Sequence, residues 1–151
     1  MYTYKKAGIE DLDMLVKTRI QILKVINELS DDCDMTEFEK ETREYYKTAL
    51  GNNTHTAILV FDGEKFIGAG GIDYYTVMPS YHNPTGKTAF IMNIYTDSQY
   101  RRKGIAYEVL DMLVKDAKDR GVENIILDST KMGRPLYEKY GFKYITDYME
   151  L

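Results

Sequence analysis

The sequence AFIMNIYTDSQYRRKGIA (residues 89–106) joins a strand-like run to the start of a helix through a short basic turn. Ala89–Thr96 is apolar, β-branched and aromatic and contains neither glycine nor proline, which predicts a largely buried strand. From Gly104 onward, apolar residues recur at helical spacing until Gly121, which indicates an amphipathic helix with a glycine stop. The predicted order is therefore strand, basic turn, helix.

This basic turn has the chemistry of an anion site. A helix N-terminus presents unpaired backbone N–H groups and the positive end of the helix dipole, and both suit a phosphate. Gly104 would let a ligand approach the backbone closely, and Arg101, Arg102 and Lys103 add positive charge. The alternative is a solvated basic turn at a helix start.

Two motifs carry a family resemblance. Arg101-x-x-Gly104-x-Ala106, placed after a buried strand, resembles the acyl-CoA pyrophosphate loop of the GCN5-related N-acetyltransferase (GNAT) family. The run LYEKYGF (Leu136–Phe142) is similar to a signature that lies further toward the C-terminus of the same proteins. Because the two motifs occur in the right order, the resemblance favours a cofactor loop over a solvated turn.

The remaining elements complete a mixed α/β (α+β) prediction. A helix predicted between Ala89–Thr96 and a strand at Asn124–Leu127 makes these two strands parallel, as a βαβ unit requires. The other expected elements are a strand at Tyr2–Lys6, two helices before residue 52, a hairpin of His55–Phe61 with Lys65–Tyr75, a short helix at Leu136–Tyr140 and a last strand at Phe142–Leu151. The expected fold is GNAT-like, one domain over residues 1–151, with a mostly antiparallel sheet and the βαβ unit at its centre.

The resemblance implies acetyl-CoA as the co-substrate. Main-chain N–H groups of the basic turn would hold its pyrophosphate, and the last residues of the preceding strand would pair with the pantetheine amides like an added strand. In the family, the strands matching Ala89–Thr96 and Asn124–Asp128 splay apart around the thioester. The cofactor-binding residues implied are Ile94, Tyr95, Thr96, Arg101, Arg102, Lys103, Gly104, Ile105, Ala106 and Tyr137.

The same resemblance suggests a catalytic acid but no base. Tyr137 aligns with the tyrosine that many members use to protonate the departing thiolate, and a phenol with a pKa of ~10 suits that task. A core tyrosine on a short helix is the alternative. Thr88 stands where histone-type members carry a glutamate base. The candidates for taking the proton of the amine are Asp73, Asn93 through an ordered water, Tyr95, and His82 in a long loop.

Composition narrows the class of protein. The chain has 151 residues and a formal net charge of −4, which disfavours nucleic acid as a partner. One cysteine, Cys33, permits no internal disulfide, and its two histidines show no metal-ligand spacing. No run of the sequence is long and apolar enough for a membrane segment or a signal core, so a cytoplasmic location without a membrane partner is expected.

The sequence therefore predicts an acetyl-CoA-dependent N-acetyltransferase that acts on a primary amine of a small molecule or a protein. The acceptor site is expected between the first two helices and the 76–88 loop. A non-catalytic acyl-CoA-binding or sensing module on the same fold is the alternative. The identity of the acceptor, the length of the acyl group and the oligomeric state stay open, and a homodimer is compatible with the sequence.

Overall fold

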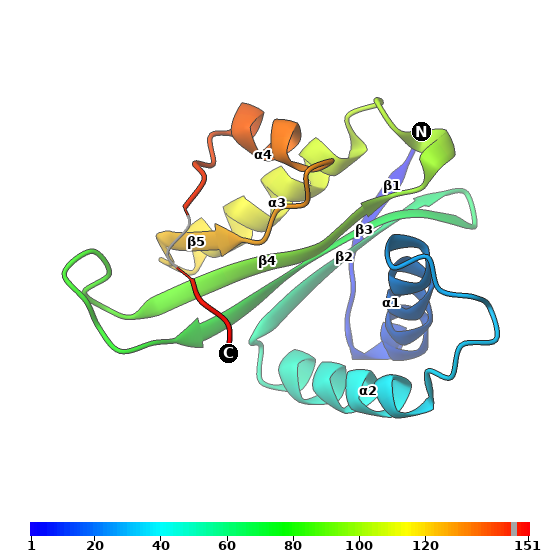
Figure 1. The fold of residues 1–151 in the computed structure, drawn as a ribbon, viewed down its shortest axis with the longest axis horizontal. Coiled ribbons are helices and arrows are strands. Elements are labelled where there is room, and N and C mark those ends of the chain that lie inside the picture. The colour runs from blue at the N-terminus through cyan, green and yellow to red at the C-terminus, as the bar shows by residue number, and fades with distance from the viewer. Residues whose placement is uncertain (146–147) are drawn as a thin grey trace.

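The computed structural model describes residues 1–145 and 148–151 and forms a five-stranded sheet with helices on both faces (Figure 1). Two short 3₁₀ turns, η1 (Ile9–Asp11) and η2 (Ser98–Tyr100), precede helices α1 and α3. The strands are β1 (Thr3–Lys6), β2 (His55–Asp62), β3 (Lys65–Thr76), β4 (Lys87–Thr96) and β5 (Asn124–Leu127). The helices are α1 (Leu12–Ile26), α2 (Thr36–Gly51), α3 (Ile105–Asp119) and α4 (Arg134–Tyr140).

The strands lie in the order β1-β2-β3-β4-β5, and only the β4–β5 pair is parallel. The chain passes from β4 through α3 to β5, and this crossover makes the pair parallel. The predicted mixed α/β class, with a mostly antiparallel sheet, is therefore confirmed.

The position of the βαβ unit differs from the prediction. Among the described residues β5 is an edge strand, so the unit lies at one side of the sheet rather than at its centre. The cause is the missing last strand, because residues 142–145 and 148–151 adopt no strand conformation. The other two positions of the expected Phe142–Leu151 strand, Thr146 and Asp147, lie outside the described residues.

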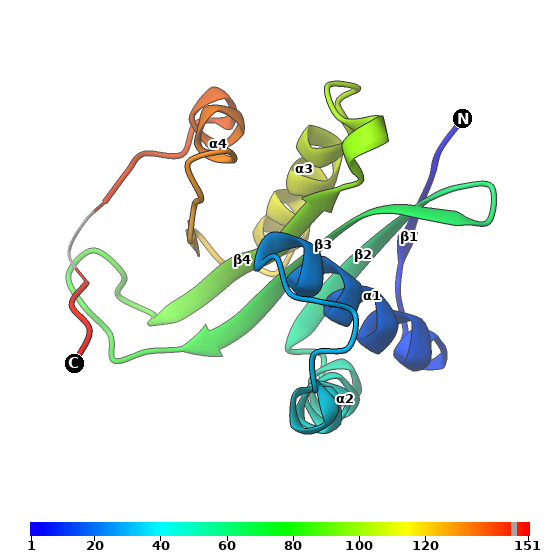
Figure 2. The same ribbon diagram turned by 45° about the vertical axis from the view of Figure 1, so that its right-hand side comes forward.

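Each face of the sheet has its own core, because side chains alternate along a strand. In β2, Ile58 and Val60 pack with α3, while Ala57 and Leu59 pack with α1 and α2. Figure 2 shows α3 and α4 on one side of the sheet and α1 and α2 on the other. None of the helices in the described part of the chain is both long and apolar enough to cross a membrane.

A bulge in β4 changes its register against β3. Ala69 pairs with Tyr95 and Gly71 with Met92, so Gly70 alone lies opposite two residues of β4. A Cβ at Gly70 would lie 2.4 Å from Cγ1 of Val109, so glycine is needed here for α3 to approach the sheet. A glycine inside a strand is typical of a bulge or a close neighbour, and Gly70 lies opposite a bulge and next to Val109.

Candidate active site

The loop after β4 is folded by local hydrogen bonds. The Asp97 carboxylate accepts a hydrogen bond from the backbone N–H of Gln99 (3.0 Å), and the Asp97 carbonyl accepts one from the N–H of Tyr100 (2.8 Å). Two residues with positive φ, Arg102 (63°) and Gly104 (82°), then turn the chain into α3. Such a left-handed conformation is unstrained for glycine, which explains Gly104 at this position.

This loop leaves backbone donors pointing at open space. The first hydrogen bond of α3 runs from the N–H of Glu108 to the carbonyl of Gly104 (3.0 Å), so the N–H groups of Ile105, Ala106 and Tyr107 have no partner within the helix. No heavy atom lies within 4 Å of the place where a Cβ of Gly104 would stand. The exposed side chains of residues 101–103 add charge. The arrangement fits the diphosphate of an acyl-CoA.

The second half of β4 is not paired with β5. The parallel pairing begins at Thr88 with Asn124 and ends at Ile91 with Leu127, although β4 continues to Thr96. Its last five residues therefore face no strand on that side within the described chain. This unpaired edge, beyond the end of β5, fits an extended ligand segment that pairs with the main chain of residues 94–96.

The bulge places Asn93 two residues beyond Ile91, the last residue of β4 that pairs with β5. Asn93 has a φ of 61°, and its Oδ1 accepts a hydrogen bond from Nη1 of Arg19 (2.9 Å). This bond ties α1 to the sheet across 74 residues of sequence. In the sequence, Arg19 falls on or near the apolar stripe of its helix. No local motif predicts its contact with Asn93.

A pocket of about 270 Å³ opens beside Asn93, on the face of the sheet that α1 and α2 cover. Two of the predicted catalytic residues, Asp73 and Asn93, share it. The other lining residues are Arg19, Phe38, Glu41, Thr42, Tyr45, Tyr46, His55 and Met92. We call this cavity the acceptor pocket.

A hydrogen-bonded cluster forms one wall of the acceptor pocket. Asp73 and His55 stand opposite each other on β3 and β2, with 2.5 Å between Oδ1 of Asp73 and Nδ1 of His55. The hydroxyl of Tyr45 donates to the same Oδ1. Burial raises the pKa of Asp73, but the hydrogen bonds from His55 and Tyr45 outweigh it and leave this pKa below its ordinary value.

The two aromatic members of this cluster were not predicted from the sequence. Burial, and then the hydrogen bond to Asp73, raises the pKa of Tyr45. His55 is 6% exposed, and its Nε2 is buried without a hydrogen-bond partner in the described part of the chain. A histidine at the start of a strand gives no signal of this environment, because its partners come from other elements.

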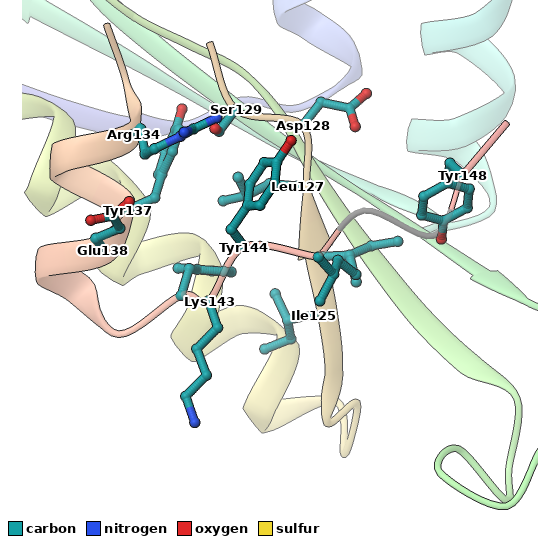
Figure 3. Close-up of a pocket in the computed structure, with 13 residues that line it drawn as sticks. Ile125, Leu127, Asp128, Ser129, Arg134, Tyr137, Glu138, Lys143, Tyr144 and Tyr148 are labelled. Carbon is teal, nitrogen blue, oxygen red and sulfur yellow. The ribbon is translucent and has the colours of Figure 1, made fainter. Parts of the chain in front are cut away.

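Tyr137 lies on the other face of the sheet. It packs against the α3 core, and burial raises the pKa of its hydroxyl, which keeps it protonated. It also lines a second cavity, of about 580 Å³, between β5, α4 and the C-terminal residues. Figure 3 shows Ser129, Arg134 and Tyr137 at one side of this cavity and Tyr148 at the opposite side. The loop of residues 101–106 does not line it.

Two further candidates lie elsewhere. His82 is exposed in the loop between β3 and β4, where its ring meets that of Tyr81 edge-on, and it lines neither cavity. Tyr95 stacks on Phe66, with 6.2 Å between the ring centroids, in the core beneath α1. The structure thus brings Asp73 and Asn93 together but leaves His82 and Tyr95 outside the acceptor pocket. Within the described residues, no group of three or more His, Cys, Asp or Glu side chains could hold a metal.

Comparison with known proteins defines the class. The Acetyltransferase (GNAT) family profile matches residues 22–142, which is most of the chain. The chain therefore belongs to the GNAT family of acetyltransferases. A search of curated proteins finds the uncharacterized N-acetyltransferase YsnE of Bacillus subtilis (strain 168), 36% identical over 59 residues. That match covers 36% of this chain and only 39% of YsnE.

Solved structures match over the whole chain. A predicted acetyltransferase from Clostridium acetobutylicum, crystallised with acetyl-CoA, is 34% identical, with a TM-score of 0.89 over 100% of this chain and 96% of that one. A GCN5-related N-acetyltransferase from Ralstonia eutropha JMP134 is 20% identical, with a TM-score of 0.84 over 100% and 98% of the two chains. At that identity the second match shows the fold alone.

Proposed function

We propose that this protein transfers the acetyl group of acetyl-CoA directly to a primary amine within a ternary complex. Family membership supplies the reaction class. The observation that carries the proposal is the course of β4, which connects the two halves of a transfer site. Its end leads into the loop of residues 97–106, which we call the anion-binding loop. Its bulge at Asn93 opens onto the acceptor pocket.

The cofactor half is built mainly from backbone. The N–H groups from Arg101 to Ala106 would hold the diphosphate, and the main chain of Ile94, Tyr95 and Thr96 would pair with the pantetheine arm. Acetyl-CoA supplies the thioester that is attacked. The Clostridium relative, whose structure contains acetyl-CoA, supports this assignment because it matches the whole chain.

Side chains of the protein would take part in two proton transfers, one from the amine and one to the departing sulfur. As the neutral amine attacks, its nitrogen forms a bond to the acetyl carbon, the carbon–sulfur bond breaks, and the amine gives up one proton. Asp73, or a water held by Asn93, would take that proton, and both residues line the acceptor pocket. Tyr137 would give a proton to the departing sulfur, and its buried, protonated hydroxyl suits this role.

The competing function is a non-catalytic acyl-CoA-binding module. The acceptor pocket favours the enzyme, because an ionised carboxylate and a buried histidine line a cavity of about 270 Å³ that also includes Asn93. A protein that only sensed the cofactor would have no use for such a pocket.

One assay separates the two functions. The protein is incubated with acetyl-CoA and a panel of small amines and peptides, and release of free thiol is followed together with the mass of each amine. Reactions without amine or without protein serve as controls. Amine-dependent thiol release with matching acetylation is the expected result. Tight acetyl-CoA binding without acetylation of any amine would support the sensor instead.

A further inference from the structure

We propose that the acceptor is an aliphatic diamine or polyamine, whose second ammonium group is bound by Asp73 while the first amine reacts beside Asn93. This inference rests on the proposed function, since it takes the cavity of about 270 Å³ to be the acceptor pocket. It assigns Asp73 to recognition of charge rather than to removal of the proton.

The first argument is the state of the Asp73 carboxylate. Both of its hydrogen bonds, from Tyr45 and from His55, end on Oδ1, and Oδ2 accepts none from the described residues. The side chain of Asp73 is 26% exposed, so this second oxygen is within reach of a ligand. A carboxylate whose pKa is held low is a weak base but a good partner for a cation.

His55 holds the Asp73 carboxylate in place within the same wall. Because the carboxylate of Asp73 accepts the hydrogen bond, Nδ1 of His55 carries the proton, and in the neutral ring Nε2 has a lone pair. This atom is buried and has no partner among the described residues, which is costly unless a ligand or water satisfies it. Because Nε2 lies beside Gly71, on the far side of the ring from the carboxylate, we assign the ammonium to Asp73 and not to the imidazole.

The opposite end of the pocket carries positive charge. Arg19 is hydrogen-bonded to Asn93, and its positive charge also contributes to lowering the pKa of Asp73. A fixed cation beside the reacting nitrogen disfavours the ammonium form there, and an amine must be neutral to attack. The pocket therefore has a positive charge, that of Arg19, beside Asn93. Its negative charge, that of Asp73, lies nearer to His55.

The spacing and lining suit a short methylene chain. Asp73 pairs with Phe90, so it lies three residues along β4 from Asn93, roughly 10 Å at about 3.3 Å per residue. The pocket also has apolar and aromatic lining residues, Phe38, Tyr45 and Met92. Glu41 is a second carboxylate in the lining and adds negative charge. An amino acid would bind in the opposite orientation, because its carboxylate would pair with Arg19, at the end of the pocket where the amine reacts.

The test compares acceptors that differ only at the far end. Binding to the full-length protein with CoA present is measured by calorimetry for putrescine, cadaverine, n-butylamine, n-pentylamine and δ-aminovalerate. Thiol release is measured separately with acetyl-CoA. Diamines should bind roughly 10- to 100-fold more tightly than the matched monoamines, the effect of one hydrogen bond to a charged group. The aminovalerate should bind worst.

Asp73→Asn sharpens the test because it keeps the shape and removes the charge. We expect it to raise Kd and KM for the diamines roughly 10- to 100-fold, so that diamines bind about as weakly as the matched monoamines. Glu123→Gln neutralises an exposed carboxylate outside the acceptor pocket and should change nothing.

Two outcomes would overturn the inference. Equal binding of diamines and monoamines by the parent protein would remove the second ammonium site, whatever the turnover. A fall in kcat for monoamines and diamines alike in Asp73→Asn would make Asp73 the proton acceptor instead. Diamine-selective binding that Asp73→Asn abolishes, without thiol release from any amine, would support the binding site and reject the acetyltransferase proposal.

Discussion

The anion-binding loop and the acceptor pocket lie at the two ends of one strand segment, yet they are built in different ways. The loop comes from one contiguous stretch, residues 97–106, and presents main-chain N–H groups. The pocket is assembled from five elements, α1, α2, β2, β3 and β4, and works through side chains. A site made of contiguous backbone can be recognised in a sequence, whereas a site made of distant side chains cannot.

The largest effect should come from the loop. Gly104→Glu places a β-carbon where φ is 82° and a negative charge beside the N–H groups that would hold the diphosphate. We expect acetyl-CoA binding to be abolished, as measured by calorimetry.

Gly121→Glu is a matched control for this variant. Gly121 also has a positive φ, of 73°, and open space where a Cβ would stand, but it lies at the other end of α3. Both variants should lose a similar amount of stability, about 1–2 kcal/mol for the left-handed conformation, and only Gly104→Glu should lose the cofactor. A folded Gly104→Glu protein that binds acetyl-CoA like the parent would show that the loop has been misassigned.

Tyr137→Phe should give the next largest effect. It keeps the ring that packs on the α3 core, so folding and acetyl-CoA affinity should barely change. If the hydroxyl protonates the leaving sulfur, kcat should fall by about 10²–10⁴-fold, toward the low end because a thiolate is already a fair leaving group. The loss should appear in kcat rather than KM. Parental turnover on a good acceptor would reduce Tyr137 to a packing residue.

The contrast between the two regions also explains what the sequence could reveal. The β4–loop–α3 order and the parallel β5 follow from local periodicity and a crossover rule, and the structure confirms them. The pairing of Arg19 with Asn93, by contrast, depends on how α1 lies on the sheet. The predicted last strand had no comparable support, because no crossover or turn motif gives Phe142–Leu151 a pairing partner.

His55 was missed for a related physical reason. Its buried position depends on Gly71, since a Cβ there would lie 2.9 Å from Cε1 and Nε2 of the imidazole. The role of this glycine is visible only once β2 and β3 are in register. A glycine in a strand signals a close neighbour but does not say which one.

Gly71→Ala tests the acceptor pocket by shifting one of its polar side chains, His55, without replacing it. The added methyl group must displace the His55 ring, so we expect about 1–3 kcal/mol of destabilisation by overpacking. We also expect KM for the amine to rise several-fold, while acetyl-CoA affinity stays at the parental value. Gly51→Ala, at the end of α2 with no atom within 4 Å of the new Cβ, is the matched control. A Gly71→Ala protein with a weakened cofactor site and an intact amine KM would reverse the assignment of the two regions.

The smallest effect should come from the residue with the most obvious chemistry. A histidine is the natural first choice for a proton acceptor, but His82 is exposed in its loop, where its ring meets that of Tyr81 edge-on, and it lines neither of the two cavities described above. His82→Ala should therefore change kcat/KM by less than about twofold, the usual range for a surface substitution. The measurement is steady-state acetylation of the best amine, with the parent and Gly71→Ala assayed beside it. If kcat/KM of His82→Ala fell by about tenfold or more, toward the effect usual for general acid–base groups, the acceptor would lie over the β3–β4 loop. The amine would then meet the thioester outside the pocket that Asp73 and Asn93 share.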